Sequence, residues 1–339
     1  MVALEKLRLP TGVSLIFERS PEPFAYTFVK PILFHNHNVL RLYNPHQIVN
    51  LLYQLHPDIV HVEAEPHSLI LGLLALLKRF FSYRLVAFSW ENLFRRGRGP
   101  LKLLEGLSLK RVDWMIVGNS EAEKVIRWRG YYGPVSVIPQ VGLDPEHFED
   151  CNHEPQTDLF QIGFAGRLVR EKGVLDLWEA FVPLAGQASL VLIGEGPLRD
   201  VICREAQALN VERYVEITGY VPYAQMPTLL KRLSVLVLPS RTTPFWKEQF
   251  GHVLVEAMLA GVPVVGSDSG AIPEVIGEAG LVFPEGNVEM LRKHLLSLMR
   301  NQEERRRLAD IGRNRALARF TDAAIGSATL RVYQQVLKK

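Results

Sequence analysis

Residues 159–177 read Leu-Phe-Gln-Ile-Gly-Phe-Ala-Gly-Arg-Leu-Val-Arg-Glu-Lys-Gly-Val-Leu-Asp-Leu, and this stretch decides the fold. Residues 159–165 are a short apolar run typical of a buried strand, and a helix is expected to begin soon after the polar residues 171–173. Similar strand, loop and helix units recur along the chain. This alternation predicts an α/β protein whose parallel sheets are covered by helices on both faces.

The same alternation predicts the individual elements of both halves. Strands are predicted in the first half at 12–17, 58–63, 84–89, 112–117 and 135–138, and helices at 45–55, 68–81, 100–110 and 121–129. Strands are predicted in the second half at 159–165, 189–193, 215–221, 234–238, 262–267 and 280–283, and helices after residue 287 at 290–299, 303–318 and 322–338.

A polar segment with two prolines, 142–156, separates the halves as a linker would. We therefore predict two Rossmann-like, doubly wound domains, at 1–150 and 151–320. A C-terminal helix at 321–339 is expected to pack back toward the first domain. Ligands of such sheets bind at the carboxyl ends of the strands, so two facing domains would form a cleft there.

Composition excludes several classes of protein. A chain of 339 residues with 47% hydrophobic content can form two cores, and a net charge of +3 is too small to indicate a nucleic-acid partner. Cys151 and Cys203 are the only cysteines, which fits a reducing cytosol and gives neither a disulfide framework nor metal-ligand spacing. The longest apolar run, 69–77, is too short to span a bilayer, and no signal peptide precedes it. We expect a cytoplasmic protein, soluble or peripheral to a membrane.

The segment 247–258, Lys-Glu-Gln-Phe-Gly-His-Val-Leu-Val-Glu-Ala-Met, indicates a ligand site. A helix is expected to begin near Gly251, where unpaired backbone N–H groups favour an anion such as a phosphate. Glu248 would precede this end, and Glu256 would face outward two turns along the helix. Two hydrogen-bond acceptors around one anion site suit a sugar nucleotide. An amphipathic surface helix with two solvated glutamates explains the pattern equally well.

Two cations follow the first strand of the second domain. Gly166 and Arg167 end this strand, and Lys172 lies at the start of the next helix. Arg167 can bind a phosphate through its planar fork, and Lys172 as a point charge. An ordinary basic loop is the alternative. A dinucleotide fingerprint is excluded by spacing, because the glycines are Gly163 and Gly166.

Other strand ends carry weaker signals. Gly194 and Gly196 would allow a ligand to approach the backbone closely, and a structural turn is an equally adequate explanation. Tyr220 and Val221 follow the third strand and could hold a planar base, although an aromatic side chain at a strand end is often simply packed.

Taken in order, these motifs resemble those of glycosyltransferase family 4. They are Gly166-Arg167, 171–173, 194–197, 219–221, 239–240, 248–256 and 260–265, with weaker matches at 57–62 and 137–144. The resemblance implies a GT-B fold and a nucleotide-sugar donor bound mainly by the second domain. It further implies retention of the anomeric configuration without a metal ion or another cofactor.

The resemblance also implies roles for individual residues. Arg167 and Lys172 would bind the diphosphate and stabilise its charge as it leaves, Glu248 would bind the sugar hydroxyls, and Glu256 the ribose. A front-face displacement is expected, because a double displacement would need a carboxylate nucleophile and none is convincing; Glu248 is the only one worth naming. The catalytic set is thus Arg167, Lys172 and Glu248, and the donor-binding set is Gly166, Gly194, Gly196, Tyr220, Val221, Phe250, Gly251, His252, Val253 and Glu256.

The first domain departs from the family pattern. The usual first strand and glycine-rich loop are missing, so this domain is expected to be shortened at its N-terminus. Where many relatives carry a histidine after the strand 84–89, this chain has Trp90, Glu91 and Asn92, which become the acceptor-side candidates, with Glu91 a possible replacement. His61 lies in an apolar strand and is expected to be a core residue.

Residues 93–111 mix basic and apolar side chains, which suits the surface of an anionic membrane at its inner face. A solvated basic loop remains the alternative. We predict a retaining hexosyltransferase of glycan or glycolipid biosynthesis whose acceptor is a saccharide or a lipid-linked saccharide. A catalytically inactive GT-B module that binds nucleotide sugar or a partner, a sugar-nucleotide epimerase and a phosphorylase of similar architecture are the other candidates.

Overall fold

The computed structural model describes residues 42–95, 99–148 and 159–338, and the backbone of five short strands between residues 2 and 33. Its contacts divide the chain into two compact units, which are described separately. Unit 1 comprises Met1–Gly118, Ala122–Val137 and Leu330–Lys339, and unit 2 comprises Asn119–Glu121 and Ile138–Thr329.

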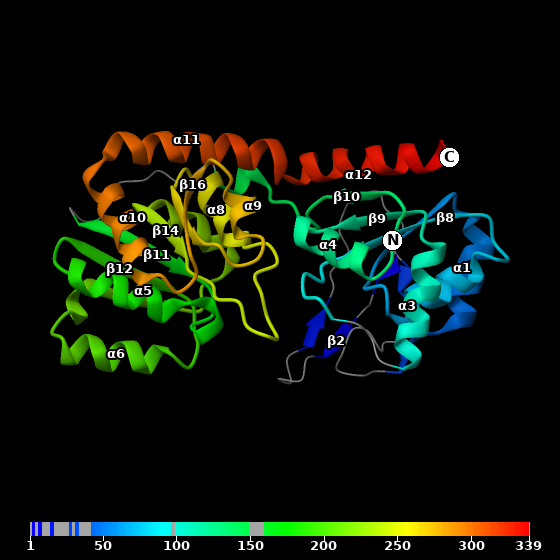
Figure 1. Cartoon of the computed structure of the whole chain (residues 1–339), viewed down its shortest axis with the longest axis horizontal. Coiled ribbons are helices and arrows are strands. Elements are labelled where there is room, and N and C mark those ends of the chain that lie inside the picture. Colours follow the sequence, from blue (N-terminus) through cyan, green and yellow to red (C-terminus); the bar gives the residue numbers. More distant parts are fainter. Residues whose placement is uncertain are drawn as a thin grey trace. The chain divides into compact units, whose positions relative to one another are not determined.

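Unit 1 contains a parallel sheet of four strands in the order β10-β9-β8-β7 (Figure 1). Its first two helices begin at side-chain caps: the Asn44 side chain accepts from His46 N at the first helix, and the Ser68 hydroxyl accepts from Leu71 N at the second. The strands are β7 (Ile59–Glu63), β8 (Arg84–Ser89), β9 (Trp114–Val117) and β10 (Val135–Val137), and the helices are α1 (Pro45–Leu55), α2 (Leu69–Leu77), α3 (Pro100–Arg111) and α4 (Ser120–Trp128).

The strand predicted at 12–17 is not part of this parallel sheet. Its described residues form β3 (Ser14–Ile16), which pairs antiparallel with β2 (Lys6–Arg8). Two further two-stranded pairs were not predicted, because strands of two or three residues are too short for a hydrophobic period to be visible. They are β1 (Val2–Ala3) with β4 (Thr27–Phe28) and β5 (Pro31–Leu33) with β6 (Leu42–Tyr43).

Unit 2 contains a parallel sheet of six strands in the order β13-β12-β11-β14-β15-β16. The chain builds outward from β11 through β12 to β13, then returns to the other side of β11 and continues outward from β14. The order therefore reverses between β11 and β14, the point at which doubly wound sheets bind ligands. The strands are β11 (Phe160–Ala165), β12 (Ala188–Ile193), β13 (Val215–Gly219), β14 (Val235–Leu238), β15 (Val264–Ser267) and β16 (Gly280–Phe283).

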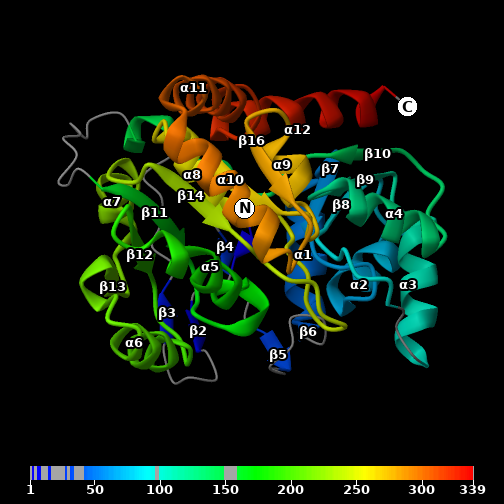
Figure 2. The ribbon, with the colours of Figure 1, turned by 60° about the vertical axis from the view of Figure 1, so that its left-hand side comes forward.

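Helices cover both faces of this sheet. Figures 1 and 2 show α5 and α6 on the opposite side of the sheet from α8 and α11. Helix α10 packs on α5, and α11 packs on α8. The helices are α5 (Val174–Phe181), α6 (Arg199–Ala208), α7 (Met226–Lys231), α8 (His252–Leu259), α9 (Ile272–Ile276), α10 (Val288–Arg300), α11 (Gln302–Arg319) and α12 (Asp322–Leu337).

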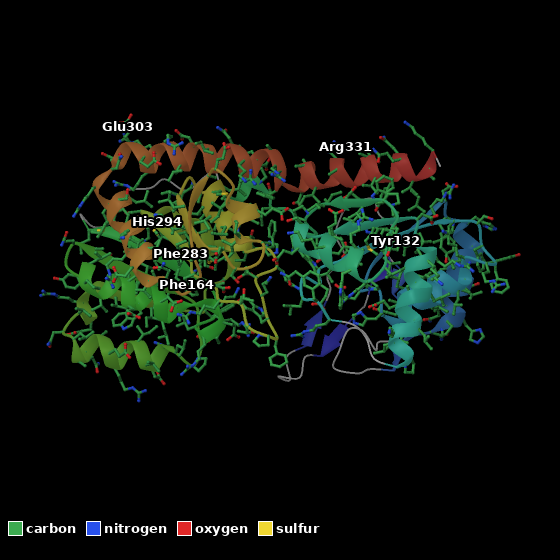
Figure 3. The ribbon with its side chains drawn as sticks, viewed as in Figure 1. Tyr132, Phe164, Phe283, His294, Glu303 and Arg331 are labelled. Atoms are coloured by element: carbon green, nitrogen blue, oxygen red, sulfur yellow. The ribbon has the colours of Figure 1, made fainter. Side chains whose placement is uncertain are left out.

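The core of unit 2 follows from strand alternation. Ile162 and Phe164 of β11 point to the face covered by α5, α6 and α10, and both are fully buried. Figure 3 shows Phe164 and Phe283 among the side chains of this unit, and both belong to one buried cluster. Gly163 points to the other face, where an added Cβ would lie 2.1 Å from Leu233 Cδ1. The prediction of two parallel-sheet α/β domains is confirmed.

The contacts divide the chain at 137/138, whereas the sequence analysis divided it at 150/151. Leu143 explains the difference: its N–H donates to Phe320 O, and its carbonyl accepts from Asp322 N, both in unit 2. The predicted linker falls largely on 149–158, which lies outside the described residues. The last helix, α12, begins in unit 2 and ends in unit 1, where Tyr333 Oη lies 2.7 Å from His61 Nδ1.

Candidate functional site

The loops after β11 and β14 bring Lys172 and Glu248 together. The Lys172 ammonium donates to Glu248 Oε2 over 2.7 Å, and the fully buried Ser240 hydroxyl donates to the same oxygen over 2.8 Å. Lys172 Nζ also lies 4.8 Å from the centre of the Trp246 ring, at the distance of a cation–π contact. Glu248 is only 7% exposed. The two hydrogen bonds, from Lys172 and from Ser240, hold its carboxylate in one orientation.

A second ion pair holds these two loops to each other. The Arg241 guanidinium donates two hydrogen bonds of 2.6 Å to the carboxylate of Asp176, a buried residue of α5. Arg241 N also donates to Glu171 O over 2.9 Å, next to Lys172. Bidentate pairs of this kind fix orientation as well as distance. The pair therefore sets the position of Lys172 relative to Ser240, which precedes Arg241.

Arg167 lies differently from Lys172. Its side chain is 66% exposed, and its guanidinium lies 3.8 Å from Glu171 Oε1. An exposed arginine at the end of β11 is free to turn toward a ligand at low energetic cost.

Glycines allow the loops around this pair to lie in backbone contact. A Cβ on Gly173, which has a φ of +67°, would lie 1.8 Å from Pro239 O, and a Cβ on Gly270 would lie 2.0 Å from Glu248 O. A Cβ added to Gly194 would lie 2.1 Å from Gly166 O, and one added to Gly196 would lie 2.4 Å from Leu168 O. These four contacts join loops that follow β11, β12, β14 and β15.

Helix α8 begins where the sequence predicted, with Gly251 at its N-cap in the left-handed conformation (φ +84°). Val253 is half-buried in the first turn. The side chain of Phe250 is buried, and its ring packs edge to face on Phe320 with centroids 5.5 Å apart. We therefore assign the Phe250 ring to packing, which leaves its backbone for any ligand contact. Desolvation lowers the pKa of His252, while Glu248 raises it and Lys172 lowers it.

Glu256 is half-buried, so the expectation that it faces outward is wrong. Burial raises its pKa to about 7, and the nearby His147 partly offsets this effect. The His147 ring stacks on Tyr223 with centroids 4.9 Å apart and an interplanar angle of 12°. Burial, followed by the charge of Glu256, raises the pKa of Tyr223. The sequence analysis missed His147 and Tyr223, which lie 109 and 33 residues before Glu256 in the chain.

The predicted base-binding residues lie at the end of β13. The Tyr220 ring is 77% exposed, and Tyr220 N donates to Glu195 Oε1 over 3.3 Å. Val221 is half-buried. An exposed aromatic ring on a strand-end turn is available for stacking.

In unit 1, Glu65 organises the loop that carries Trp90, Glu91 and Asn92. Glu65 Oε1 accepts from Trp90 N over 2.9 Å and from Glu91 N over 3.2 Å, and Oε2 accepts from the Ser89 hydroxyl over 2.6 Å. Burial raises the pKa of Glu65, against these hydrogen bonds and the charge of Arg129. Asn92 is 2% exposed, so its side chain is closed to solvent in this structure. The sequence analysis missed Glu65, although it follows β7 as Trp90 follows β8.

A buried arginine lies beneath this loop. The Arg129 side chain is 1% exposed and donates twice to Arg95 O, over 2.9 and 3.2 Å. It lies 3.6 Å from Glu105 Oε2 and 3.8 Å from Glu65 Oε2. Arg129 thereby connects the loop after β8 to helix α3.

The surface of residues 93–111 carries exposed apolar groups beside basic ones. Phe94 is 57% and Leu103 79% exposed, and the Phe94 ring packs edge to face on Trp128 with centroids 5.6 Å apart. Lys102 and Lys110 are exposed on the same helix. Residues 96–98 of the predicted segment lie outside the described residues. In the part of the chain that the structure describes, no helix is long and apolar enough to cross a membrane.

Within residues 42–95, 99–148 and 159–338, no group of three or more His, Cys, Asp or Glu side chains is arranged to hold a metal ion.

The chain is similar in sequence to known glycosyltransferases. Residues 148–315 match the family described as Glycosyl transferases group 1. A glycogen synthase of Mycobacterium tuberculosis is 29% identical over 197 residues, which are 57% of this chain and 46% of that protein. Sulfoquinovosyl transferase SQD2 of Arabidopsis thaliana is 25% identical over 284 residues, which are 76% of this chain and 53% of that protein. The chain spans about half the length of the curated relatives it matches.

Solved structures show the fold. Alr3699/HepE of Anabaena, determined in complex with UDP, superposes with a TM-score of 0.73 at 18% identity, covering 86% of this chain and 82% of that one. A glycosyltransferase from Rickettsia africae gives a TM-score of 0.72 at 15% identity, covering 87% and 81%. Together with the two parallel-sheet units, these structures confirm the predicted GT-B fold.

Proposed function

We propose that this chain, whose residues 148–315 match the group 1 glycosyl transferases, transfers a hexose from a nucleotide sugar to a saccharide or a lipid-linked saccharide. The family match and the GT-B fold support the reaction class. The observation that carries the proposal is the pair of Lys172 and Glu248, held 2.7 Å apart where the strand order of unit 2 reverses. We further propose that the anomeric configuration is retained and that no metal ion takes part.

The donor would be held by unit 2. Lys172 and Arg167 would neutralise the diphosphate, which also suits the N–H groups at the start of α8. Glu248 would accept hydrogen bonds from the sugar hydroxyls, because a carboxylate that is already oriented binds hydroxyls at a small entropic cost. Glu256 would accept from the ribose, and the exposed Tyr220 ring would stack on the base.

The chemical step follows from the placement of charge. As the bond between the sugar and the diphosphate breaks, negative charge grows on the leaving phosphate, and Lys172 and Arg167 stabilise it. The leaving phosphate accepts the proton of the acceptor hydroxyl, which attacks from the same face of the sugar. Glu248 is hydrogen-bonded to both Lys172 and Ser240, an arrangement that favours a binding role over a nucleophilic one.

The acceptor would bind at unit 1. Trp90 and Glu91 combine an aromatic ring and a carboxylate at the carboxyl end of β8, and Glu65 holds their backbone in place. Aromatic rings cover the apolar faces of sugars, and carboxylates accept from sugar hydroxyls. Glu91 is the acceptor-side residue that would contact the incoming hydroxyl.

The proposal is tested with UDP-, GDP- and ADP-sugars. Binding is screened by thermal shift, because a ligand of the native state raises the melting temperature. The sugar that binds is then offered with saccharide and lipid-linked acceptors, and products are identified by mass spectrometry and NMR. We expect Lys172→Ala and Glu248→Ala to lower kcat/KM at least about 100-fold, while the exposed Lys293→Ala on α10 leaves it unchanged.

Two of the alternatives, the inactive module and the epimerase, would each give a different result. Binding of a nucleotide sugar without any turnover would indicate an inactive module, and a changed sugar nucleotide without transfer would indicate an epimerase. Full activity of either site variant would remove Lys172 or Glu248 from the mechanism.

A chelator tests the proposal that no metal takes part. We expect the rate of transfer to be unchanged in EDTA, because Lys172 and Arg167 supply the positive charge that a divalent cation would otherwise bring to the diphosphate. Initial rates with and without EDTA measure this. Loss of activity in EDTA that magnesium or manganese restores would contradict it.

A further inference from the structure

A cavity of about 690 Å³ lies at the amino ends of the strands of unit 2. Phe160 and Gln161 begin β11 there, Ser234 precedes β14, and Pro263 precedes β15. Because the strands are parallel, this edge of the sheet is the one opposite Gly166 and Ser240. The cavity, called the arginine pocket below, is therefore separate from the proposed donor site.

Four arginines line the pocket: Arg232 after α7, Arg300 at the end of α10, and Arg305 and Arg306 in α11. No aspartate or glutamate is among the described residues of its lining. Glu303, labelled in Figure 3, is exposed at the start of α11, the helix that carries Arg305 and Arg306. Arg232 lies 2.9 Å from Glu216 Oε2, an ion pair that neutralises one of the four charges.

The Arg305 guanidinium is held inside the arginine pocket by neighbouring groups. Its guanidinium lies 5.4 Å from the centre of the Phe160 ring, and NH1 donates to the carbonyls of Leu298 and Met299 at the end of α10. Burial, followed by the like charge of Arg306, lowers the pKa of Arg305. Like charges in a shared cavity repel one another, and a bound anion would relieve this repulsion.

Two polar atoms of the lining have no hydrogen-bond partner among the described residues. Gln161 Oε1 is a buried acceptor on a residue that is 4% exposed, and Arg232 Nε is a buried donor. Buried polar atoms in folded proteins are nearly always hydrogen-bonded, so an unpaired acceptor and an unpaired donor on two residues of one lining indicate a ligand or solvent that supplies both partners. A ligand for this pocket therefore offers a hydroxyl to Gln161 and anionic oxygens to the arginines.

We propose that the arginine pocket binds a small phosphorylated polyol, such as a sugar phosphate. The phosphate would lie between Arg300 and Arg306, because the guanidinium fork matches phosphate oxygens and Arg305 is already engaged by carbonyls. A hydroxyl of the polyol would donate to Gln161 Oε1, and its apolar face would rest on Met299. The volume falls within the usual range for small-molecule sites, roughly 300–1,000 Å³. The proposal does not depend on the proposed transferase activity.

Glucose 6-phosphate is the probe, with glucose and inorganic phosphate as comparisons, and binding to the full chain is measured by calorimetry. We expect saturable binding that the double variant Arg300→Ala/Arg306→Ala weakens at least about tenfold, because two charge-assisted contacts are lost. The double variant Arg199→Ala/Arg204→Ala removes the same charge from exposed positions of α6 outside the pocket and should bind normally. Lys172→Ala, which alters the donor site, should also bind normally.

The variant Gln161→Leu tests the hydroxyl contact separately from the phosphate contact. We expect it to weaken glucose 6-phosphate at least about fivefold and to leave inorganic phosphate unchanged, because only the hydroxyl contact is lost. Thermal unfolding of each variant checks that it folds. Vesicles of phosphatidylcholine with phosphatidylinositol 4-phosphate carry the same chemistry on a lipid, so binding to them alone, dependent on Arg300 and Arg306, would assign the ligand to a headgroup.

Several outcomes would overturn the proposal. These are the absence of saturable binding to any of these phosphates, an equal loss in the α6 double variant, and a loss in Lys172→Ala. The first would leave the pocket without an anion, the second would show a diffuse charge effect, and the third would place the phosphate in the donor site. Equal binding of glucose 6-phosphate by Gln161→Leu and the parent would exclude the polyol contact.

Discussion

At the scale of single residues, the proposed donor site combines two charged side chains that are held in place, Lys172 and Glu248, with an exposed one, Arg167. Lys172 and Glu248 are oriented by Ser240 and Trp246, whereas Arg167 is exposed at the end of β11. The oriented residues would lose little entropy when a donor binds, and Arg167 would close on the diphosphate last. A residue that is ordered only in the transition state contributes to turnover more than to affinity.

Glu256 gives a prediction about pH. Its pKa in the folded protein is raised to about 7 by burial, so between its ordinary value near 4.5 and pH 7 the native state keeps a proton that the unfolded state loses. Stability from this group is therefore fully present below pH 4.5 and is lost as the pH rises to 7. We expect Glu256→Gln to be more stable than the parent at pH 8 by about 1 to 3 kcal/mol, and equal to it near pH 4.5.

Urea unfolding at the two pH values measures this difference. Asp310→Asn, at an exposed position of α11, removes the same charge and serves as the control. If Glu256→Gln is no more stable than the parent at pH 8, the carboxylate of Glu256 is better solvated than its burial indicates.

At the scale of elements, periodicity predicted most of the structure correctly. The bounds predicted for α1, β8 and β16 agree with those observed, and the strands of both sheets were found within a few residues. The strand predicted at 12–17 corresponds to β3, whereas β1, β2, β4, β5 and β6 were missed because strands of two or three residues have no period to detect. Lys172 and Glu248, 76 residues apart, were both singled out, because each stands at a strand end or helix start that can be recognised locally.

Their partners could not be predicted in the same way. Asp176 and Arg241 form an ion pair across 65 residues, and neither stands in a recognisable motif. Phe250 is the converse case: it lies inside the motif 248–256, but its ring packs on Phe320. A sequence shows which residues are near a strand end, whereas tertiary packing decides which of them point toward the ligand.

A substitution at Gly173 tests the contact between the loops after β11 and β14. We expect Gly173→Ala to destabilise the protein by about 2 kcal/mol or more, because the φ of +67° is strained for alanine and the Cβ would overlap Pro239 O. Nucleotide-sugar binding should weaken as well, because Lys172 is the preceding residue. Urea unfolding and calorimetry measure the two effects.

Gly106→Ala is the matched control. Gly106 lies within α3, and an added Cβ would meet no atom within 4 Å. Since alanine is the better helix former, we expect this variant to be more stable than the parent by about 0.5 to 1 kcal/mol. Equal effects of the two substitutions would show that the loops separate without cost.

At the scale of the whole molecule, unit 1 contributes the proposed membrane surface. We expect the full chain to bind vesicles that contain anionic lipid, with an affinity that falls as salt is added, because Lys102 and Lys110 are exposed on the same helix as the exposed Leu103. Replacing either lysine with alanine should weaken binding about fivefold, from roughly 1 kcal/mol per charge. Sedimentation with the vesicles measures this.

Lys293→Ala, at an exposed position of unit 2, is the control for loss of charge. Equal binding to neutral vesicles, or an equal loss in the Lys293 variant, would show that residues 93–111 are a solvated basic loop. Membrane association, where it occurs, would bring a lipid-linked acceptor to the unit that carries Trp90 and Glu91.

The four glycine contacts have a consequence for protein engineering. The loops after β11, β12, β14 and β15 contact one another through main-chain atoms, so the backbone conformation of each loop constrains that of the loop beside it. Exchanging one of them for the loop of a relative, in order to change the donor sugar, would leave a mismatched surface against its neighbours. Donor specificity in this scaffold should therefore be transplanted as a set of four loops, with their glycines, rather than one loop at a time.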